Sequence, residues 1–277
     1  MATIRIMVNG LPGNMASEVV KAAREDGGFE LVPFALTGPE ITAASAEAGG
    51  VTFQLVRPDK RDETLTRLTR EFPGFITIDY SHPTAVNGNA EFYCRHGLPF
   101  VMGTTGGDRP ALEKTVAGSR TAAVIAPNMA KQIVGVQMML EHAAANFPGL
   151  FKGYTMRLEE SHQAGKADTS GTARAMVGYF NKMGVPFKAA DITMVRDPRV
   201  QKETWGVPDA CLKGHAYHTY TLTSADGSVD VQIEHNVRGR RVYALGTLDA
   251  VRFLHGKVAT GAAGVFTMLD VLRAGMA

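Results

Sequence analysis

The chain has 277 residues, enough for one large domain or two modest ones, each with its own hydrophobic core. Lys and Arg outnumber Asp and Glu by only 29 to 27, and this balance argues against a dedicated nucleic-acid binder. No apolar run approaches the ~20 residues of a membrane-spanning helix, so we expect no membrane partner. Cys94 and Cys211 lack metal-ligand spacing, which favours reduced thiols in a cytoplasmic protein without a bound metal.

The N-terminal half alternates short β-rich runs with helical patterns. Residues 1–6 are typical of the start of a strand and not of a signal peptide. Strands are predicted at 4–8, 29–36, 51–56, 75–79, 99–102 and 121–126, and helices at 15–25, 60–72, 85–96 and 110–117. Nearly all-apolar strands separated by helices indicate a parallel sheet covered on both faces. We therefore predict a doubly wound α/β domain of the Rossmann type.

A glycine-containing turn follows the first predicted strand. Gly10 and Gly13 let the backbone turn sharply and approach a pyrophosphate at the N-terminus of the next helix. The dinucleotide fingerprint G-x-G-x-x-G is incomplete, because Ala16 is small but is not Gly, and glycines here can also serve packing alone. We predict that this turn binds a dinucleotide through Asn9, Gly10, Gly13, Asn14 and Met15.

The end of the second predicted strand bears on the choice of cofactor. An Asp or Glu at this place usually binds the ribose hydroxyls and disfavours a 2′-phosphate. Here the strand runs into Thr37 and Gly38, and the first carboxylate, Glu40, comes a few residues late. The missing acid favours NADPH, with NADH as the alternative, and we expect Thr37 to contact the cofactor.

Two later loops follow buried strands and should lie at the same edge of the sheet. Ligands of open α/β sheets bind at the carboxyl ends of the strands. We therefore predict cofactor contacts from Gly103, Thr104 and Thr105 in one loop, and from Ala126, Pro127, Asn128 and Met129 in the other. The alternative for the first loop is a tight turn with a helix cap.

After Pro127 the pattern changes. A long helix at 131–147 is followed by strands at 154–159, 192–195, 216–223 and 229–237, with a helix at 172–183. Every second residue of 229–234 is apolar, which indicates a sheet with one buried and one solvent-exposed face. We predict an α+β domain with a mixed open sheet over 131–246. Because the tail 265–272 is again apolar, we assign about 247–277 to the first domain, together with 1–130.

The most distinctive stretch is Glu160–Thr172. It combines an imidazole (His162), an ammonium group (Lys166) and a hydroxyl-Gly-hydroxyl turn formed by Ser170, Gly171 and Thr172, directly before a helical segment. Backbone N–H groups at the start of a helix can hold an anion. Alone, the imidazole and the ammonium would be ordinary surface groups, but together they predict a site where a small carboxylate undergoes proton transfer.

These motifs together resemble the 4-hydroxy-tetrahydrodipicolinate (dihydrodipicolinate) reductases of lysine and diaminopimelate biosynthesis, and most closely their plant-type branch. The resemblance is carried by the glycine turn, by residues 79–83, 103–106 and 126–129, by the stretch 160–172, and by residues 214–223 and 239–249.

The resemblance implies reduction of a cyclic imine-type dicarboxylate with NADPH or NADH. His162 would be the acid and Lys166 the essential amine, while Ser170, Gly171 and Thr172 would bind a substrate carboxylate. Arg240 falls where the family has a substrate-proximal arginine, with Arg238 and Arg241 close by. The resemblance also adds Asp79 and Tyr80 to the expected cofactor contacts.

Several questions stay open at this point. Asn14 and Ala16 replace the usual basic residue and Gly of the family's first turn. A homo-oligomer is expected, a dimer by the plant-type resemblance and a tetramer by the bacterial one. The rival functions are a Rossmann dehydrogenase acting on an amino acid, which would take up or release ammonia, and a non-catalytic NADPH sensor.

Overall fold

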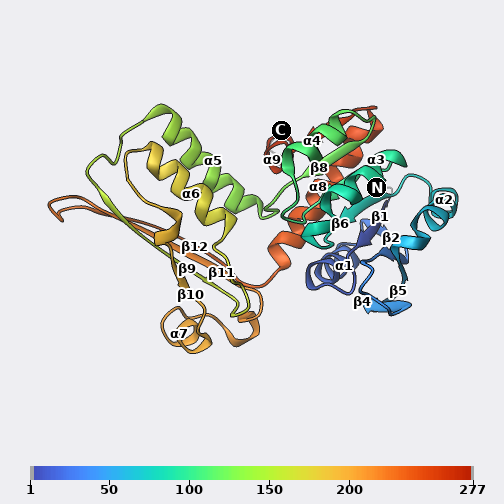
Figure 1. The fold of residues 1–277 in the computed structure, drawn as a ribbon, viewed down its shortest axis with the longest axis horizontal. Helices are drawn as coiled ribbons and strands as arrows, with labels where there is room; N and C mark the ends of the chain where they lie inside the picture. The colour runs from blue at the N-terminus through green and yellow to red at the C-terminus, as the bar shows by residue number, and fades with distance from the viewer. Residues whose placement is uncertain (1–2, 276–277) are drawn as a thin grey trace. The chain divides into compact units, whose positions relative to one another are not determined.

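The structure is a computed structural model that describes residues 3–275 (Figure 1). Met1 and Ala2, which the sequence places at the start of the first strand, lie outside the described residues. The chain divides into two compact units. Unit 1 consists of Met1–Lys131 and Tyr243–Ala277, and unit 2 of Gln132–Val242. Within residues 3–275, no helix has both the length and the apolar character that crossing a membrane requires.

Unit 1 is built on a parallel sheet of six strands in the order β13-β8-β7-β6-β1-β2. These strands are β1 (Ile4–Asn9), β2 (Phe29–Leu31), β6 (Ile76–Asp79), β7 (Phe100–Met102), β8 (Ala122–Ile125) and β13 (Gly264–Phe266). A second sheet has the order β3-β5-β4, with β3 (Phe34–Leu36), β4 (Ser45–Ala48) and β5 (Val51–Val56).

The predicted strand 29–36 is thus two strands. Residues 32 and 33 interrupt it, and Pro33 has no N–H to donate to a sheet ladder. The first half, β2, pairs with β1, whereas the second half, β3, pairs in parallel with β5. The interruption therefore passes the chain from one sheet to the next.

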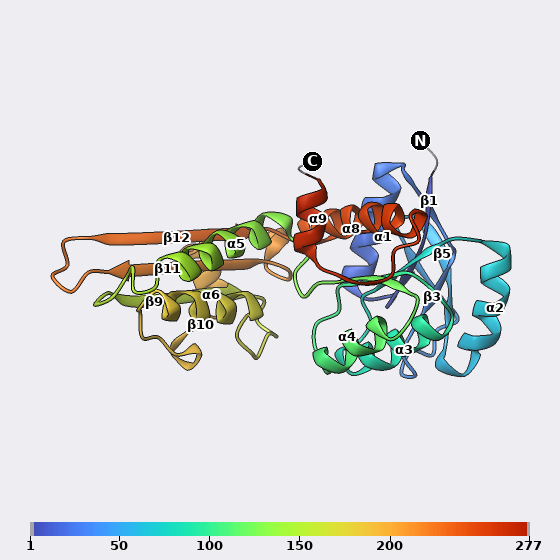
Figure 2. The same ribbon diagram turned by 90° about the horizontal axis from the view of Figure 1, so that it is seen from above.

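Helices cover both faces of the large sheet, as Figure 2 shows. One layer holds α1 (Asn14–Asp26) and α8 (Arg241–Ala259), and the other holds α3 (Val86–Arg95) and α4 (Arg109–Ala117). Buried side chains of α3, α4 and α2 (Arg61–Glu71) form one continuous core with the strands, including Leu65, Tyr93 and Leu112. This arrangement confirms the doubly wound Rossmann-type fold.

The C-terminal segment of unit 1 returns to the large sheet. The helix α8, which the sequence did not predict, leads to β13, and β13 pairs in parallel with β8. The last helix is α9 (Met268–Ala274). A Cβ atom on Gly246 of α8 would lie 1.8 Å from the carbonyl oxygen of Met129, so only glycine fits this close approach.

Unit 2 is a mixed sheet in the order β10-β9-β11-β12, with two helices on one face (Figure 1). Its strands are β9 (Thr155–His162), β10 (Thr193–Val195), β11 (Ala216–Thr223) and β12 (Asp230–Val237), and its helices are α5 (Lys131–Asn146), α6 (Gly171–Lys182) and α7 (Pro198–Glu203). Buried residues of α6 pack with Leu158, Tyr220 and Leu222 of the sheet. The predicted mixed, half-exposed sheet is confirmed. Short 3₁₀ turns lie at Pro58–Lys60, Pro83–Ala85, Ala189–Asp191 and Asp209–Cys211.

The strand β9 is longer than the sequence predicted. It was expected to end at residue 159, but it continues to His162, which pairs with Ala216 of β11. Because alternate strand residues share a face, Glu160 and His162 lie on the same face as the core residue Leu158. Polar residues on a buried face hide the strand pattern, and this explains the early end of the prediction.

Candidate active site

Two cavities open at the carboxyl edge of the unit 1 sheets. One of about 630 Å³ runs from the glycine turn to Glu40 and Arg61, and one of about 300 Å³ lies beside the loops after β7 and β8. Tyr80 and Ser81 line both. Ten of the predicted cofactor residues line these cavities: Gly10, Gly13, Met15, Thr37, Tyr80, Gly103, Thr104, Thr105, Pro127 and Met129. Asn9, Asn14, Asp79, Ala126 and Asn128 do not line either cavity.

The glycine turn has the features of a pyrophosphate site. Gly10 has a φ of 96°, and a Cβ atom there would lie 2.2 Å from the carbonyl oxygen of Tyr80. The helix α1 begins after Gly13 without a side-chain cap. Its first N–H groups therefore have no side-chain acceptor and can receive phosphate oxygens. These features fit a bound dinucleotide.

Asp79 and Asn9 bind other protein groups. The buried Asp79 carboxylate accepts five hydrogen bonds, which come from Ser81, Thr104, Asn89 and Tyr93. Asn9 donates to the Tyr93 hydroxyl and accepts the Leu36 N–H. Burial and the neighbouring Asp79 charge raise the pKa of Tyr93 well above its usual value, so its phenol stays a donor. These two residues hold the loops beside the two cavities in place.

The end of β3 requires a correction. The sequence suggested that no carboxylate lies there, but the Glu40 side chain folds back onto the turn. A Cβ atom at Gly38 would be 2.2 Å from Glu40 Oε1. Arg61 donates to the carbonyl oxygen of Thr37 at 2.8 Å, and Glu40 and Arg61 line the same cavity. One negative and one positive group thus flank the position where the adenosine ribose is expected.

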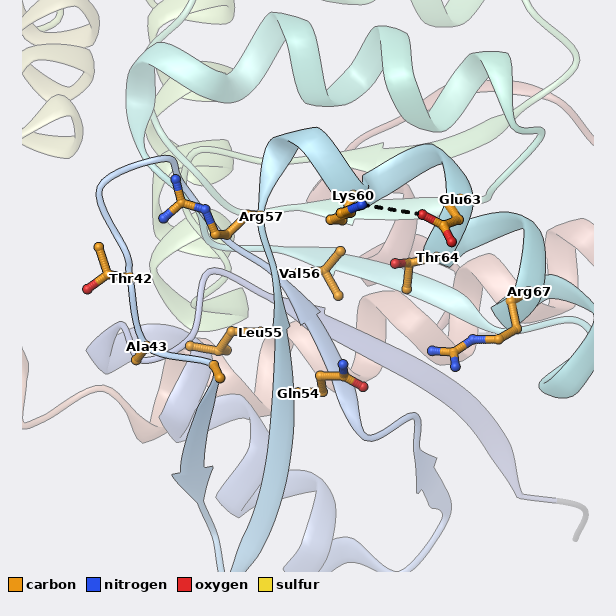
Figure 3. Close-up of a pocket in the computed structure, with 11 residues that line it drawn as sticks. Thr42, Ala43, Gln54, Leu55, Val56, Arg57, Lys60, Glu63, Thr64 and Arg67 are labelled. Carbon is orange, nitrogen blue, oxygen red and sulfur yellow. Dashed lines mark ion pairs between the residues drawn. The ribbon is translucent and has the colours of Figure 1, made fainter.

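A further cavity of about 550 Å³ lies between β5 and α2 (Figure 3). None of the predicted site residues lines it. It is lined by three cations. Arg57 is 3.9 Å from Asp59, Lys60 is 3.8 Å from Glu63, and Arg67 lies over the Phe34 ring at 5.2 Å. These existing partners satisfy its positive charges, and we assign it no part in the site.

In unit 2, a buried polar cluster lies on the helix-facing side of the sheet. It consists of the buried Glu160, His162 and His218 and the half-buried His235, and the register places His218 opposite both Glu160 and His235. Glu160 is fully buried; its Oε1 lies 2.5 Å from Arg196, and its Oε2 accepts the Ser170 N–H at 2.9 Å. A buried carboxylate thus joins the end of β9 to the start of α6.

His162 is 7% exposed and electrically neutral in the free protein. Burial lowers its pKa to about 3, and the charges of Arg196 and Lys166 act in the same direction. Among residues 3–275 its Nε2 has no hydrogen-bond partner, and it lies 3.9 Å from Glu160 Oε2. With a neutral ring, this contact is not an ion pair. This unpartnered nitrogen is itself buried.

Lys166 lies on the loop between β9 and α6. Its ammonium donates to Asp168 Oδ1 at 2.6 Å, and this hydrogen bond lowers the pKa of Asp168. Asp168 is 70% exposed at its side chain, so an anionic ligand can compete with it for the amine. The positive charge of Lys166 also lowers the pKa of His162. The two residues of the predicted site therefore interact electrostatically.

The hydroxyl-Gly-hydroxyl turn begins α6 as predicted, but the Ser170 hydroxyl already binds backbone groups of the helix. Ser170 is the N-cap, and its hydroxyl accepts the N–H groups of Thr172 and Ala173. Gly171 is exposed, and Thr172 is half-buried. The exposed part of the turn at Gly171 is where a carboxylate can approach.

Arg240, the candidate substrate arginine, binds a backbone group of unit 2. It donates to the carbonyl oxygen of Lys213 at 2.7 Å, just ahead of β11. Arg238 instead lies over the Tyr217 ring at 5.5 Å. None of the contacts within residues 3–275 joins Arg240 to His162 or Lys166, so its substrate role stays a prediction.

Two residues beside the cluster were missed from the sequence. Arg196, directly after β10, contacts Glu160 and the loop that carries Lys166. Gln201 of α7 is 1% exposed and donates to the carbonyl oxygen of His162 at 2.7 Å. Neither lies in a recognisable motif, and only the parallel pairing of β10 with β9 brings them to the site.

Three groups of this cluster could also ligate a metal ion. Glu160, His162 and His218 offer ligand atoms within 4.8 Å of one another. However, the Glu160 carboxylate is already neutralised by Arg196 and hydrogen-bonded to the backbone of Ser170. A bound cation would therefore have to compete with a fixed guanidinium, and we assign no metal.

The parallel sheet of unit 1 and its glycine-lined cavity define an NAD(P)-binding enzyme of the Rossmann type. The second unit adds a buried carboxylate–histidine cluster with a lysine-bearing loop. The chain belongs to the dihydrodipicolinate reductase family: the N-terminal model of that family matches residues 4–129, and the C-terminal model matches residues 133–272.

Curated relatives agree with this assignment. The chain is 45% identical to 4-hydroxy-tetrahydrodipicolinate reductase 2, chloroplastic, of Arabidopsis thaliana, over 98% of this chain and 78% of the relative. It is 44% identical to a probable chloroplastic enzyme of the same name from Oryza sativa subsp. japonica, over 98% and 83%. A relative from Thiobacillus denitrificans, also a 4-hydroxy-tetrahydrodipicolinate reductase, is 27% identical over 98% of both chains. The plant-type resemblance is confirmed.

Solved structures share the fold. A dipicolinate-bound dihydrodipicolinate reductase from Paenisporosarcina superposes with a TM-score of 0.66 at 18% identity, covering 97% of this chain and 98% of that one. A meso-diaminopimelate dehydrogenase mutant from Clostridium tetani gives 0.54 at 12% identity, over 97% and 94%.

Proposed function

We infer that this chain catalyses the NAD(P)H-dependent reduction of 4-hydroxy-tetrahydrodipicolinate to tetrahydrodipicolinate in lysine and diaminopimelate biosynthesis. The observation that carries this inference is the unpartnered His162 nitrogen beside the Lys166 loop, in a chain that belongs to this family over nearly its whole length. Family membership alone is also compatible with an inactive relative. The reaction additionally needs an acid and a cationic amine, and His162 and Lys166 provide these two groups.

Each proposed role follows from the chemistry of the group. When bound, the dinucleotide would supply a hydride, and the 4-hydroxyl group of the substrate would leave as water, so that each turnover consumes one hydride and one proton. His162 donates a proton from its ring nitrogen to the reduced substrate, and a positioned acid contributes about 10²–10⁴-fold to the rate. Lys166 exchanges Asp168 for a substrate carboxylate and offsets negative charge. Gly171, with the Ser170 and Thr172 hydroxyls, and Arg240 are proposed to hold the carboxylates.

The cofactor proposal follows from the two charges at the end of β3. Glu40 suits a free ribose 2′-hydroxyl, as in NADH, whereas Arg61 suits a 2′-phosphate, as in NADPH. We therefore propose that the chain accepts both cofactors. Gly10, Gly13 and the uncapped α1 would hold the pyrophosphate. The nicotinamide end is proposed to lie in the cavity lined by Tyr80, Gly103 and Pro127.

The deciding assay follows the loss of NADPH absorbance with freshly generated 4-hydroxy-tetrahydrodipicolinate. Wild-type turnover is expected to fall by about 10²–10⁴-fold in His162→Gln and to fall strongly in Lys166→Met, with cofactor affinity unchanged. Glu141→Gln, an exposed change on α5, serves as the control and should leave the rate intact. Cofactor binding without oxidation would favour the sensor, and ammonia-dependent turnover would favour an amino-acid dehydrogenase.

The assembly of the chain and its location in the cell are further proposals. The exposed face of the unit 2 sheet presents polar residues such as Arg157, Glu159 and Glu234, and we propose that a second copy of the chain covers it. Light scattering should then give a dimer or a tetramer, and a monomer at micromolar concentration would contradict this. The names of the Arabidopsis and rice relatives favour the chloroplast stroma over the cytoplasm. Imaging of the tagged chain in its own cells tests this location.

A further inference from the structure

Arg196 is the most heavily engaged side chain around the unit 2 cluster. A guanidinium has five N–H donors, and five hydrogen bonds leave this one. Two go to the loop, to the carbonyl oxygens of Lys166 at 2.9 Å and Asp168 at 3.3 Å. Two hydrogen bonds go to Glu160, one to its carbonyl oxygen at 3.3 Å and one to its Oε1 at 2.5 Å. The fifth goes to the carbonyl oxygen of Val195 at 3.2 Å.

Apart from Arg196, the loop 163–169 is held by Arg174, which donates to the carbonyl oxygen and the hydroxyl of Thr169 at the end of the loop, and by bonds within the loop. Between the end of β9 and Ser170, its backbone makes a turn bond from the Lys166 N–H to the Gln163 carbonyl oxygen. No residue of 163–169 is fully buried. The two bonds from Arg196 therefore fix the backbone at Lys166 and two residues after it. The charge that orients the guanidinium is Glu160, which lies at the base of the loop.

We propose that Arg196 is a positioning residue: it fixes the 163–169 loop so that the Lys166 ammonium meets the substrate carboxylate. This inference rests on the function proposed above, and neither the family's motif nor the sequence prediction includes Arg196. A misplacement of about 1 Å at a binding group can cost 10²-fold in rate, which is the size of effect at stake.

The chemistry of the guanidinium makes the Arg196→Lys variant the most informative change. An ammonium keeps the positive charge opposite Glu160, so the protein should fold and melt close to the wild type. However, it has three donors on one atom and cannot reach Glu160, Lys166 and Asp168 together. We expect kcat/KM to fall about 10- to 100-fold, with the KM for the cofactor unchanged. Arg199→Lys, an exposed change on α7, is the matched control.

A double-mutant cycle tests whether Arg196 acts through Lys166. The readout is the binding of dipicolinate by titration calorimetry, which needs no turnover. Arg196→Lys should weaken binding about tenfold in the wild-type background but less than about threefold in Lys166→Met. Equal losses in both backgrounds would overturn the proposal, as would equal kcat/KM for the Arg196→Lys and Arg199→Lys variants. If the cycle shows coupling but the wild type never reduces the substrate, the proposed function fails and the positioning role stands.

Discussion

His162 is neutral in the free protein at pH 7, since burial, Arg196 and Lys166 lower its pKa to about 3. An acid in this state must gain a proton before it can give one. A ligand with two carboxylates near Lys166 opposes the positive charges that depress the pKa, so ligand binding should raise it. Dipicolinate is a stable probe of this effect.

We therefore expect dipicolinate to bind with uptake of up to about one proton per site near pH 6.5. Calorimetry in buffers with different ionisation enthalpies measures this uptake. His162→Gln should abolish it while leaving a measurable affinity. A heat of binding that does not depend on the buffer in the wild type would show that His162 is not the group that gains the proton.

Glu40 gives a second prediction at the scale of single residues. Its carboxylate lies against Gly38 and would repel a 2′-phosphate. Glu40→Gln should raise the ratio of kcat/KM for NADPH to that for NADH by about tenfold, or ~1.4 kcal/mol. The control is Glu47→Gln, an exposed change on β4. An unchanged ratio would mean that Glu40 does not face the ribose.

Among the elements, α8 depends on one close contact. Gly246 approaches the Met129 carbonyl oxygen so closely that a Cβ atom would lie 1.8 Å from it. A Cβ atom on Gly256 of the same helix would have no described atom within 4 Å apart from its chain neighbours and the backbone of the helix itself. Gly246→Ala must displace the helix or the cofactor loop and should destabilise the protein by about 1–3 kcal/mol.

The matched substitution on α8, Gly256→Ala, should increase the free energy of unfolding instead of lowering it. Gly256→Ala removes a flexible residue from a helix without a clash, and we expect a gain of about 0.5–1 kcal/mol. Urea unfolding of both variants measures the two effects. Equal effects of the two substitutions would contradict the contact between α8 and the Met129 loop.

Much of the fold and part of the site follow from local sequence. The turn after β1 is predictable because Gly10 and Gly13 are needed for its backbone, and the start of α6 because Ser170 caps it. The helix α8 was missed because its buried face includes glycine and threonine in place of large apolar residues. These small residues allow close packing but weaken the periodic signal.

The remaining site residues depend on contacts that sequence spacing does not encode. Arg196 reaches the Lys166 loop only through the pairing of β10 with β9. Glu40 reaches Gly38 only because the chain folds back after β3. Glu160 and His162 belong to a strand whose inner face is partly polar. A single sequence gives no signal for such tertiary contacts.

At the scale of the whole molecule, the histidine cluster links stability to pH. Burial lowers the pKa of His162 to about 3 and of His235 to about 4, and it lowers that of His218 well below its usual value. The unfolded chain binds protons to these rings below pH ~6.5, and the folded protein does not. Stability is therefore complete above about pH 6.5 and falls as the pH drops toward 4.

The free energy of unfolding should fall by about 2 kcal/mol for each of these histidines between pH 7.5 and pH 5. Urea unfolding at the two pH values measures the loss. His235→Gln should reduce the difference by the share of one histidine, whereas His255→Gln, an exposed change on α8, should leave it as it is. A stability that is the same at both pH values would contradict a neutral, buried cluster.

The pairing of β13 with β8 has a consequence for how the chain is made. Residues 264–266 complete a sheet whose other five strands lie before residue 126, so the whole of unit 2 is synthesised in between. Domains fold as units during synthesis, from the N-terminus onward. On the ribosome, β8 therefore remains an open edge until residues 264–266 emerge. The cofactor-binding unit begins first and is finished last.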